Sequence, residues 1–280
     1  ITVVYQEQGM THHIQMTTYR SEAAYTDSRH PDDVTYETDI KNDLSRRDFT
    51  MNALAYDPIG NVLLDEFNGQ EHLKRGELVV IGDPVKRFTE DSLRLFRLCR
   101  FASQLDLTPN QVCLDALNKL APEISLPSIE RIHVELDKMI QSFSPQKGLT
   151  LLSQSQLGER VIPKFNRISD TLFHYLSKID PTLRWAILLK QLKLHDCFDA
   201  LSFSNKEKKW ISDLVKYQLD PKKASFTIKD LKLTGKDIMG MGFKGPEIGE
   251  IQSYLFDQVI NDFSLNTKLI LKELVSKRLN

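Results

Sequence analysis

The chain has only three cysteines in 280 residues, no long hydrophobic run and almost no net charge. Cys99, Cys113 and Cys197 lack the paired spacing of a zinc site or a disulfide framework, so we expect reduced thiols in a cytoplasmic protein. No apolar stretch reaches the ~18 residues that a membrane-spanning helix needs, and we expect no membrane partner. A net charge of −1 excludes a uniformly basic coat for nucleic acid and leaves room only for a local patch.

Strand patterns are confined to the region before Gly82. Apolar and β-branched runs at Val3–Tyr5 and Ile14–Thr18 predict one hairpin. Runs at 53–56 and 62–64 flank a turn signal and predict a second. Between them, the polar stretch from Tyr19 to Asp33 has few apolar anchors and is typical of a mobile loop.

Helical patterns account for most of the rest. Ile40–Asn52 is expected to be one helix, with Asp39 or Asn42 as its cap. After Gly82 helical periodicity continues to the C-terminus, and prolines divide it into short helices. These prolines are Pro122, Pro127, Pro145, Pro163, Pro181 and Pro221. The sequence thus predicts an α+β chain with a small mixed part followed by a long helical part.

A helix predicted from Phe88 to Leu105 is apolar around most of its circumference, which is typical of a buried helix. It also carries four charged residues at successive i+3 positions: Asp91, Arg94, Arg97 and Arg100. Buried charges need a partner or a polar ligand. In one interpretation Asp91 and Arg94 pair with each other. In the second interpretation, three arginines and only one aspartate give an excess of positive charge, which would suit a triphosphate.

Asp91 and Arg94 also have the chemistry to read a base edge. The carboxylate accepts from an exocyclic amine, and the guanidinium donates to a ring nitrogen or a carbonyl oxygen. Cytosine and adenine present an amine there, whereas uracil and guanine present a carbonyl. The pair could therefore accept C and A and reject U and G, at ~1–3 kcal/mol per unpaired buried group.

The residues from Arg46 to Asn52 could form a second set of contacts with a nucleotide. On the predicted helix, Asp48 and Asn52 share one face at i, i+4 and could bracket a ribose hydroxyl. Arg46 or Arg47 could then reach a phosphate. The alternative is a solvated helix with surface salt bridges, and this motif alone favours neither. The order of the two motifs indicates an enzyme that handles nucleotides.

Five stretches resemble motifs of the bacterial class II tRNA nucleotidyltransferases, the CCA-adding family of the polymerase β superfamily. They are Thr17–Pro31, Asp43–Ala53, Asp65–Gly69, Gly82–Arg94 with Arg97 and Arg100, and Ser128–Ile132 with Glu135. The resemblance implies an α+β fold with a partial polymerase β-like nucleotidyltransferase head at 1–82, followed by an all-α neck, body and tail. The neck would be 83–144 with the nucleotide template, the body 145–221, and the tRNA-binding tail 222–280.

The resemblance also implies roles for individual residues. Nucleotide-binding residues would be Arg46, Arg47, Asp48, Asn52, Asp91, Arg94, Arg97 and Arg100. Residues supporting the template would be Glu90, Glu130 and Arg131, and the flexible loop would contribute Arg20, Tyr25, Asp27 and Arg29. The implied activity is addition of CCA, or its terminal A, to tRNA 3′ ends from CTP and ATP.

One family motif has no counterpart in the chain. The family binds Mg²⁺ through an Asp-x-Asp pair on a strand, which we expect upstream of Ile1, so the catalytic residues are not assigned. Asp32 and Asp33 lack the spacing and the strand context to replace them. We therefore expect Mg²⁺ as the cofactor of the parent enzyme, no metal ligand within the chain, and no activity of residues 1–280 alone.

Three alternatives stay open. A bacterial poly(A) polymerase shares both main motifs but has a longer, strongly basic C-terminus. A CC-adding relative would lack the loop at Tyr19–Asp33, which is present. The third alternative is a non-catalytic tRNA-binding module.

Overall fold

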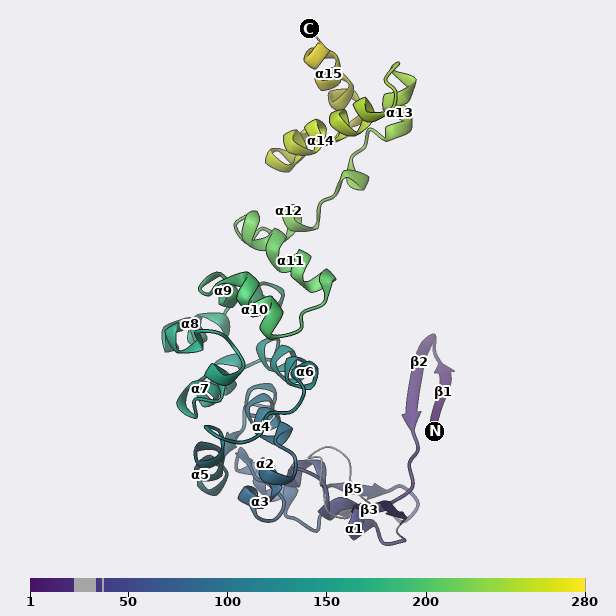
Figure 1. The fold of residues 1–280 in the computed structure, drawn as a ribbon. Helices are drawn as coiled ribbons and strands as arrows, with labels where there is room; N and C mark the ends of the chain where they lie inside the picture. Colours follow the sequence, from purple (N-terminus) through teal and green to yellow (C-terminus); the bar gives the residue numbers. More distant parts are fainter. Residues whose placement is uncertain (23–33, 37, 280) are drawn as a thin grey trace. The chain divides into compact units, whose positions relative to one another are not determined.

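The computed structural model describes residues 1–22, 34–36 and 38–279 (Figure 1). They form two compact units, Ile1–Phe203 and Ser204–Asn280. Within the described residues, strands occur only in the first unit, and no helix is both long and apolar enough to cross a membrane. All three cysteines are buried and free. The four-part division expected from the sequence stays a prediction.

The first predicted hairpin is confirmed. β1 (Thr2–Glu7) and β2 (Met10–Gln15) pair antiparallel, and Gln8 and Gly9 connect them. Both connecting residues have positive φ, 50° and 79°. Two such residues in a row give a turn whose twist matches that of the strands, and glycine accepts this conformation without strain.

Two further strand pairs follow. β5 (Ala55–Asp57) and β6 (Val62–Leu64) form the second predicted hairpin, which is also confirmed. β3 (Arg20–Glu22) pairs antiparallel with β4 (Val34–Tyr36), so the stretch predicted as a loop from Tyr19 begins with a strand. Residues 23–33 of that stretch lie outside the described residues.

The helix expected over Ile40–Asn52 is wrong in its second half. Asp39 does cap the helix, but α1 (Ile40–Ser45) ends at Ser45, and only a 3₁₀ turn, η1 (Thr50–Asn52), follows. Between them the main chain pairs with a distant segment: the Ile81 amide donates to the Asp48 carbonyl at 3.1 Å. This tertiary pairing takes the place of helical hydrogen bonds.

The helix expected over Phe88–Leu105 is interrupted near its start. α3 (Pro84–Glu90) ends before Asp91, and α4 (Leu93–Gln104) begins two residues later. Asp91 itself is extended, with φ −143° and ψ 101°, and its Oδ1 accepts from the Leu93 amide at 3.2 Å. This local bond competes with a continuous helix. The predicted burial is confirmed, because nine of the twelve residues of α4 are buried.

Two of the predicted prolines begin helices in the first unit. Pro145 and Pro181 are the first residues of α7 and α9, where the missing amide costs no hydrogen bond. Besides α1, α3 and α4, the helices of the first unit are α2 (Gly69–Lys74), α5 (Gln111–Leu120), α6 (Ile129–Ile140), α7 (Pro145–Gln154), α8 (Asp170–Leu176), α9 (Pro181–Lys190) and α10 (Leu194–Ala200). A short parallel pair, β7 (Glu77–Leu78) with β8 (Thr108–Pro109), was not predicted.

The core of the first unit is built around α4, which packs against α6 and α7. Gly148 lets α7 approach closely, since a Cβ atom there would lie 2.6 Å from the Cys99 carbonyl oxygen and 2.4 Å from Met139 Sδ. The Gly148 amide also donates to Ser103 Oγ at 2.8 Å. α4 is therefore held on two sides, which fixes the direction of its arginines.

The second unit is helical throughout its described residues. Its helices are α11 (Asn205–Lys216), α12 (Pro221–Ser225), α13 (Gly235–Gly240), α14 (Pro246–Asn261) and α15 (Lys268–Leu279), with 3₁₀ turns η4 (Ile228–Asp230) and η5 (Phe263–Leu265). Apolar residues of α13, α14 and α15 form its core together with Leu231 and Leu233.

Candidate nucleotide-binding site

Arginines and carboxylates of α1, the 46–52 segment, α3, α4 and α6 form four sets of ion pairs, which are together called the arginine network here. Most of its residues were predicted as site residues. Its seven arginines are Arg46, Arg47, Arg87, Arg94, Arg97, Arg100 and Arg131. Its five carboxylates are Asp43, Asp48, Glu90, Asp91 and Glu135. Among these twelve residues the arginines outnumber the carboxylates by two, and an excess of positive charge attracts anionic ligands.

Asp43 fixes the start of the 46–52 segment. It is 5% exposed, and its two carboxylate oxygens contact Arg46 Nη2 at 2.6 Å and Arg47 Nη2 at 3.3 Å. Arg47 also donates from Nη1 to the Asn52 carbonyl oxygen at 3.2 Å. The Arg47 side chain remains 45% exposed and so can also meet a ligand.

Arg87 holds the same segment from α3. Its Nη2 donates to the carbonyl oxygens of Arg46 and Arg47, the second at 2.7 Å, and its Nη1 donates to Glu90 Oε2 at 2.6 Å. Sequence reasoning did not assign Arg87 or Asp43 to the site. Both lie within the matching motif stretches, but their contacts depend on a fold that spacing alone does not give.

Asp48 is brought to Asn52 and to Arg97, although no helix joins these residues as predicted. Oδ1 accepts from Asn52 Nδ2 and from the Phe49 amide, each at 2.9 Å, and Oδ2 accepts from Arg97 Nε at 2.6 Å. Burial alone would raise the pKa of the Asp48 carboxyl. The Arg97 charge and the hydrogen bonds outweigh it and hold that pKa below its ordinary value.

Glu135 on α6 neutralises the arginines of α4. It is 5% exposed, and it lies 2.6 Å from Arg100 Nε and 3.8 Å from Arg97 Nη1. Burial lowers the pKa of the Arg100 guanidinium, and the Glu135 charge opposes that shift. The Arg100 guanidinium also lies over the Phe101 ring, 3.8 Å from its centre. Glu135 was quoted in a matching motif, but sequence reasoning gave it no site role.

Asp91 and Arg94 do not pair with each other among the described contacts, so that interpretation is wrong. Arg94 uses Nη1 for Glu90 Oε2 at 3.2 Å and for the Arg87 carbonyl oxygen at 2.8 Å. Asp91 Oδ2 lies 3.5 Å from Arg131 Nη2. The helix break turns Asp91 toward α6, whereas Arg94 points back along α3.

The remaining predicted residues lie elsewhere. Glu130 is exposed at the start of α6 and forms no ion pair with a described residue, whereas Arg131, which was also predicted to support the template, pairs with Asp91. Arg20 lies in β3. Tyr25, Asp27 and Arg29 fall outside the described residues.

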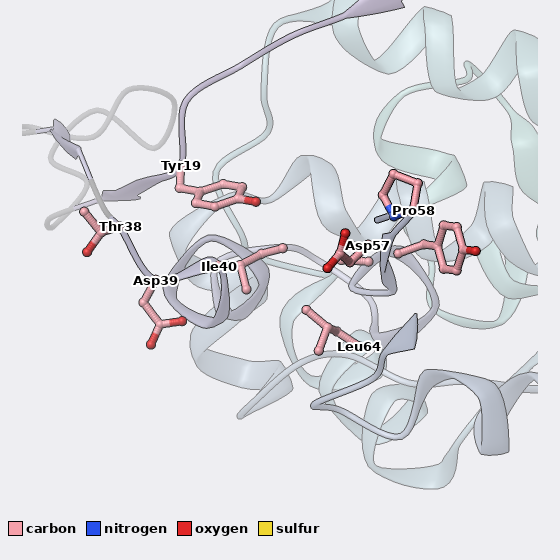
Figure 2. Close-up of a pocket in the computed structure, with 9 residues that line it drawn as sticks. Tyr19, Thr38, Asp39, Ile40, Asp57, Pro58 and Leu64 are labelled. Atoms are coloured by element: carbon pink, nitrogen blue, oxygen red, sulfur yellow. The ribbon is translucent and has the colours of Figure 1, made fainter. Parts of the chain in front are cut away.

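A separate hollow of about 560 Å³ lies in the first unit (Figure 2). Tyr19, the start of α1 and the β5–β6 hairpin surround it, and Asp57 and Leu64 belong to its wall. It shares no residue with the predicted nucleotide-binding set. We therefore place the candidate site at the arginine network and not in this hollow.

The described residues do not fit the Mg²⁺ that the family resemblance implies. Among residues 1–22, 34–36 and 38–279, no group of three or more His, Cys, Asp or Glu side chains is arranged to hold a metal ion. The carboxylates of the arginine network are each paired with guanidinium groups. No step below is derived through a metal.

Comparisons with known proteins agree with the sequence motifs. Residues 1–79 match the "Poly A polymerase head domain" family, and residues 106–168 match the "Probable RNA and SrmB- binding site of polymerase A" family. The CCA-adding enzyme of Lactococcus lactis is 36% identical over 220 residues, 74% of this chain and 54% of the relative. That of Oceanobacillus iheyensis is 35% identical over 212 residues, 73% of this chain and 52% of the relative.

The fold is also shared with a solved structure. The CCA-adding enzyme of Bacillus stearothermophilus, solved in complex with CTP, superimposes with a TM-score of 0.69 at 23% identity, over 99% of this chain and 81% of that one. The α+β head and the helical remainder therefore follow the architecture of that protein. The chain spans about half the length of the curated relatives it matches. On these sequence and fold similarities, the chain belongs to the CCA-adding enzyme family.

Proposed function

We propose that the protein adds CCA, or its terminal adenosine, to the 3′ end of tRNA, with CTP and ATP as substrates. Support comes from the family and from one observation: Asp91 and Arg94, at the junction of α3 and α4, both keep hydrogen-bonding atoms that no described contact uses. The relatives are named CCA-adding enzymes, and solved ones were complexed with CTP, with ATP and with tRNA. A cytoplasmic location belongs to the proposal and suits three buried free thiols.

Asp91 and Arg94 are assigned to the base. Every described contact of the Arg94 guanidinium uses Nη1, so its Nε and Nη2 are available to donate to a ring nitrogen or carbonyl oxygen. The Asp91 carboxylate keeps lone pairs beyond those used by Leu93 and Arg131, and one can accept an exocyclic amine. This chemistry admits cytosine and adenine and leaves the partly buried Asp91 acceptor unpaired against uracil or guanine.

The sugar and phosphates are assigned to the other members of the predicted set. Asp48 already uses both carboxylate oxygens, so the ribose contact falls mainly to Asn52, which Asp48 orients. Among the predicted arginines of the network, Arg47 has the most exposed side chain. It is assigned to phosphate together with Arg46. Arg97 is 30% exposed and can contribute, while Arg100, at 9%, braces α4.

Supporting roles complete the proposal. Glu90 and Arg131 hold Arg94 and Asp91 in place, and Glu130 is kept only on the family resemblance. The loop with Arg20, Tyr25, Asp27 and Arg29 would adjust the pocket between cytosine and adenine, which differ in size. Residues 222–280 would bind the tRNA. Mg²⁺ would be the cofactor, held outside the described residues.

The test is nucleotide addition by the protein at its full native length. The substrate is a tRNA transcript without CCA, supplied with labelled CTP and ATP, and product length is read on a gel. We expect growth by at most three nucleotides. A long adenosine tail would instead identify a poly(A) polymerase, the activity suggested by the names of the two matched domains. Tight tRNA binding without any addition would indicate a non-catalytic module.

A further inference from the structure

Helix α6 lies between α4 and α9 and contacts both (Figure 1). Arg131 and Glu135, four residues apart, meet Asp91 and the arginines of α4. His133 and Asp137 meet α9. At about 100° per residue, this second pair lies on the opposite side of the helix from the first. The helix that supports the candidate site is therefore itself held from behind by α9.

Trp185 of α9 contacts two successive turns of α6. Its Nε1 donates to Asp137 Oδ1 at 2.9 Å, and its ring stacks on His133 with 6.1 Å between centres and 14° between planes. Phe203 packs edge to face against both rings, 5.0 Å from Trp185 and 4.6 Å from His133. Trp185 is 6% exposed. A buried indole N–H needs an acceptor, so the bond to Asp137 fixes the direction of this contact.

Arg184, the neighbour of Trp185, holds the C-terminal end of α6. It is 4% exposed, and its Nη1 donates to the carbonyl oxygens of Ile140, at 2.9 Å, and of Ser142. Its Nε and Nη2 donate to the Ile179 carbonyl oxygen at 3.3 and 3.2 Å. These described bonds all go to the main chain, so the planar guanidinium ties the end of α6 to the turn before α9.

The contacts on the other side of α6 are sensitive to its position. Arg131 Nη2 lies 3.5 Å from Asp91 Oδ2, at the limit of a hydrogen bond, whereas Glu135 Oε2 lies 2.6 Å from Arg100 Nε. A shift of α6 by about 0.5 Å would break the first contact or strain the second. The Asp91 carboxylate would then be free to turn away from a bound base. A binding site keeps its geometry only when the residues behind it are held as well.

We propose that Arg184 and Trp185 are positioning residues for base selection, which act on Asp91 and α4 through α6. The inference rests on the proposed function, in which Asp91 and Arg94 select the base, and extends it to a helix outside the five matching motif stretches. Neither residue of α9 would touch the nucleotide. A purely structural role would leave the choice of base unchanged in the folded protein.

The test measures the dissociation constants of CTP, ATP, UTP and GTP with the 280-residue chain by titration calorimetry. Trp185→Phe removes the indole N–H and keeps an aromatic ring in its place. Trp210→Phe, the same change at a half-buried position of α11 in the second unit, is the matched control. The ratio of two affinities does not depend on the fraction of molecules that are folded, so a loss of stability alone cannot change it.

We expect Trp185→Phe to reduce the preference for CTP over UTP, and for ATP over GTP, at least about threefold. Trp210→Phe should leave both ratios as they are in the parent. Equal ratios in Trp185→Phe and the parent would overturn the inference and leave base selection by Asp91 intact. Absence of any preference in the parent would contradict the proposed function itself, and the inference with it.

Further variants test the hydrogen bond and the guanidinium. Asp137→Asn keeps an oxygen that can accept from Trp185 Nε1 and should behave like the parent, whereas Asp137→Leu should reproduce the ratios of Trp185→Phe. Arg184→Lys keeps the charge but loses the planar fork and should also lower the ratios. Thermal melting gives the temperature below which each variant is folded. Equal losses in Asp137→Asn and Asp137→Leu would overturn the role of the Trp185 hydrogen bond.

The route through Asp91 has its own test. Trp185→Phe should weaken CTP binding in the parent chain but not in the Asp91→Ala chain, because the acceptor that it positions is then gone. A loss of the same size in both chains would show that Trp185 acts independently of Asp91, and would overturn the proposed route.

Discussion

Arg97 and Asp48, which are 49 residues apart in the chain, form the ion pair that joins α4 to the 46–52 segment. Arg97 Nε lies 2.6 Å from Asp48 Oδ2, and the other oxygen of the same carboxylate holds Asn52. The position of α4 therefore determines where Asn52 presents its amide. The base contact proposed at the start of α4 and the ribose contact proposed at Asn52 are in this way linked through the Asp48 carboxylate.

The Asp48 carboxylate should make the stability of the folded chain depend on pH. Its pKa is lower in the folded than in the unfolded chain, so the folded state binds fewer protons and loses this contribution as pH falls below about 4. Asp48→Asn should cost about 1–3 kcal/mol of unfolding free energy at pH 7 and less at pH 3. Urea unfolding at both pH values measures this. The control Asp115→Asn, at an exposed position of α5, should change the unfolding free energy little at either pH. An equal loss of unfolding free energy at pH 7 and pH 3 for Asp48→Asn would refute the ion-pair account.

Glu135→Gln should destabilise the first unit. The change keeps the shape but leaves Arg100, and in part Arg97, without the anion that neutralises them, at a cost of about 3 kcal/mol. Glu130→Gln, the same change on the exposed face of the same helix, should stay within about 0.5 kcal/mol. Chemical unfolding compares the two, and equal stabilities would mean that Glu135 does not support α4.

Gly148→Ala should weaken the packing of α7 on α4. The new Cβ would lie within 2.6 Å of three atoms, one of them the Cys99 carbonyl oxygen, and such overpacking costs about 1–3 kcal/mol. Gly249→Ala in α14 is the matched control, because no atom lies within 4 Å and the helix gains up to about 1 kcal/mol. Thermal melting should shift in opposite directions; a stabilised Gly148→Ala would show that α7 does not approach α4 this closely.

Asp91→Ala should reduce discrimination between nucleotides. Removing the acceptor takes away the contact that favours an exocyclic amine, so preference for C and A over U and G should fall by about tenfold or more. Arg94→Ala should weaken CTP and ATP alike. Addition assays with the full-length protein and each of the four nucleotides give the ratios. Unchanged ratios in Asp91→Ala would assign that residue a structural role with Arg131.

Features set by local sequence were predictable. The β1–β2 turn at Gln8 and Gly9, the β5–β6 hairpin and the helix starts at Pro145 and Pro181 depend on residues adjacent in the chain. Their conformations are fixed by glycine, proline and strand-forming runs without help from the rest of the fold.

Features set by distant partners were not predictable from periodicity. α1 stops at Ser45 because the Asp48 carbonyl pairs with Ile81, and no pattern near Asp48 indicates this. Asp91 leaves the helical path and meets Arg131, 40 residues away. In the candidate site, the residue types were predictable from the motifs, whereas the pairing of each charge required the folded structure.

The central claim is that the start of α4 reads cytosine and adenine, and the most direct measurement is equilibrium binding of the four nucleoside triphosphates to the 280-residue chain. Titration calorimetry gives the four dissociation constants under identical conditions. The account predicts that CTP and ATP bind at least about tenfold more tightly than UTP and GTP, and that Asp91→Ala removes this difference. Four equal affinities in the unaltered chain, or no measurable binding of any of them, would contradict it.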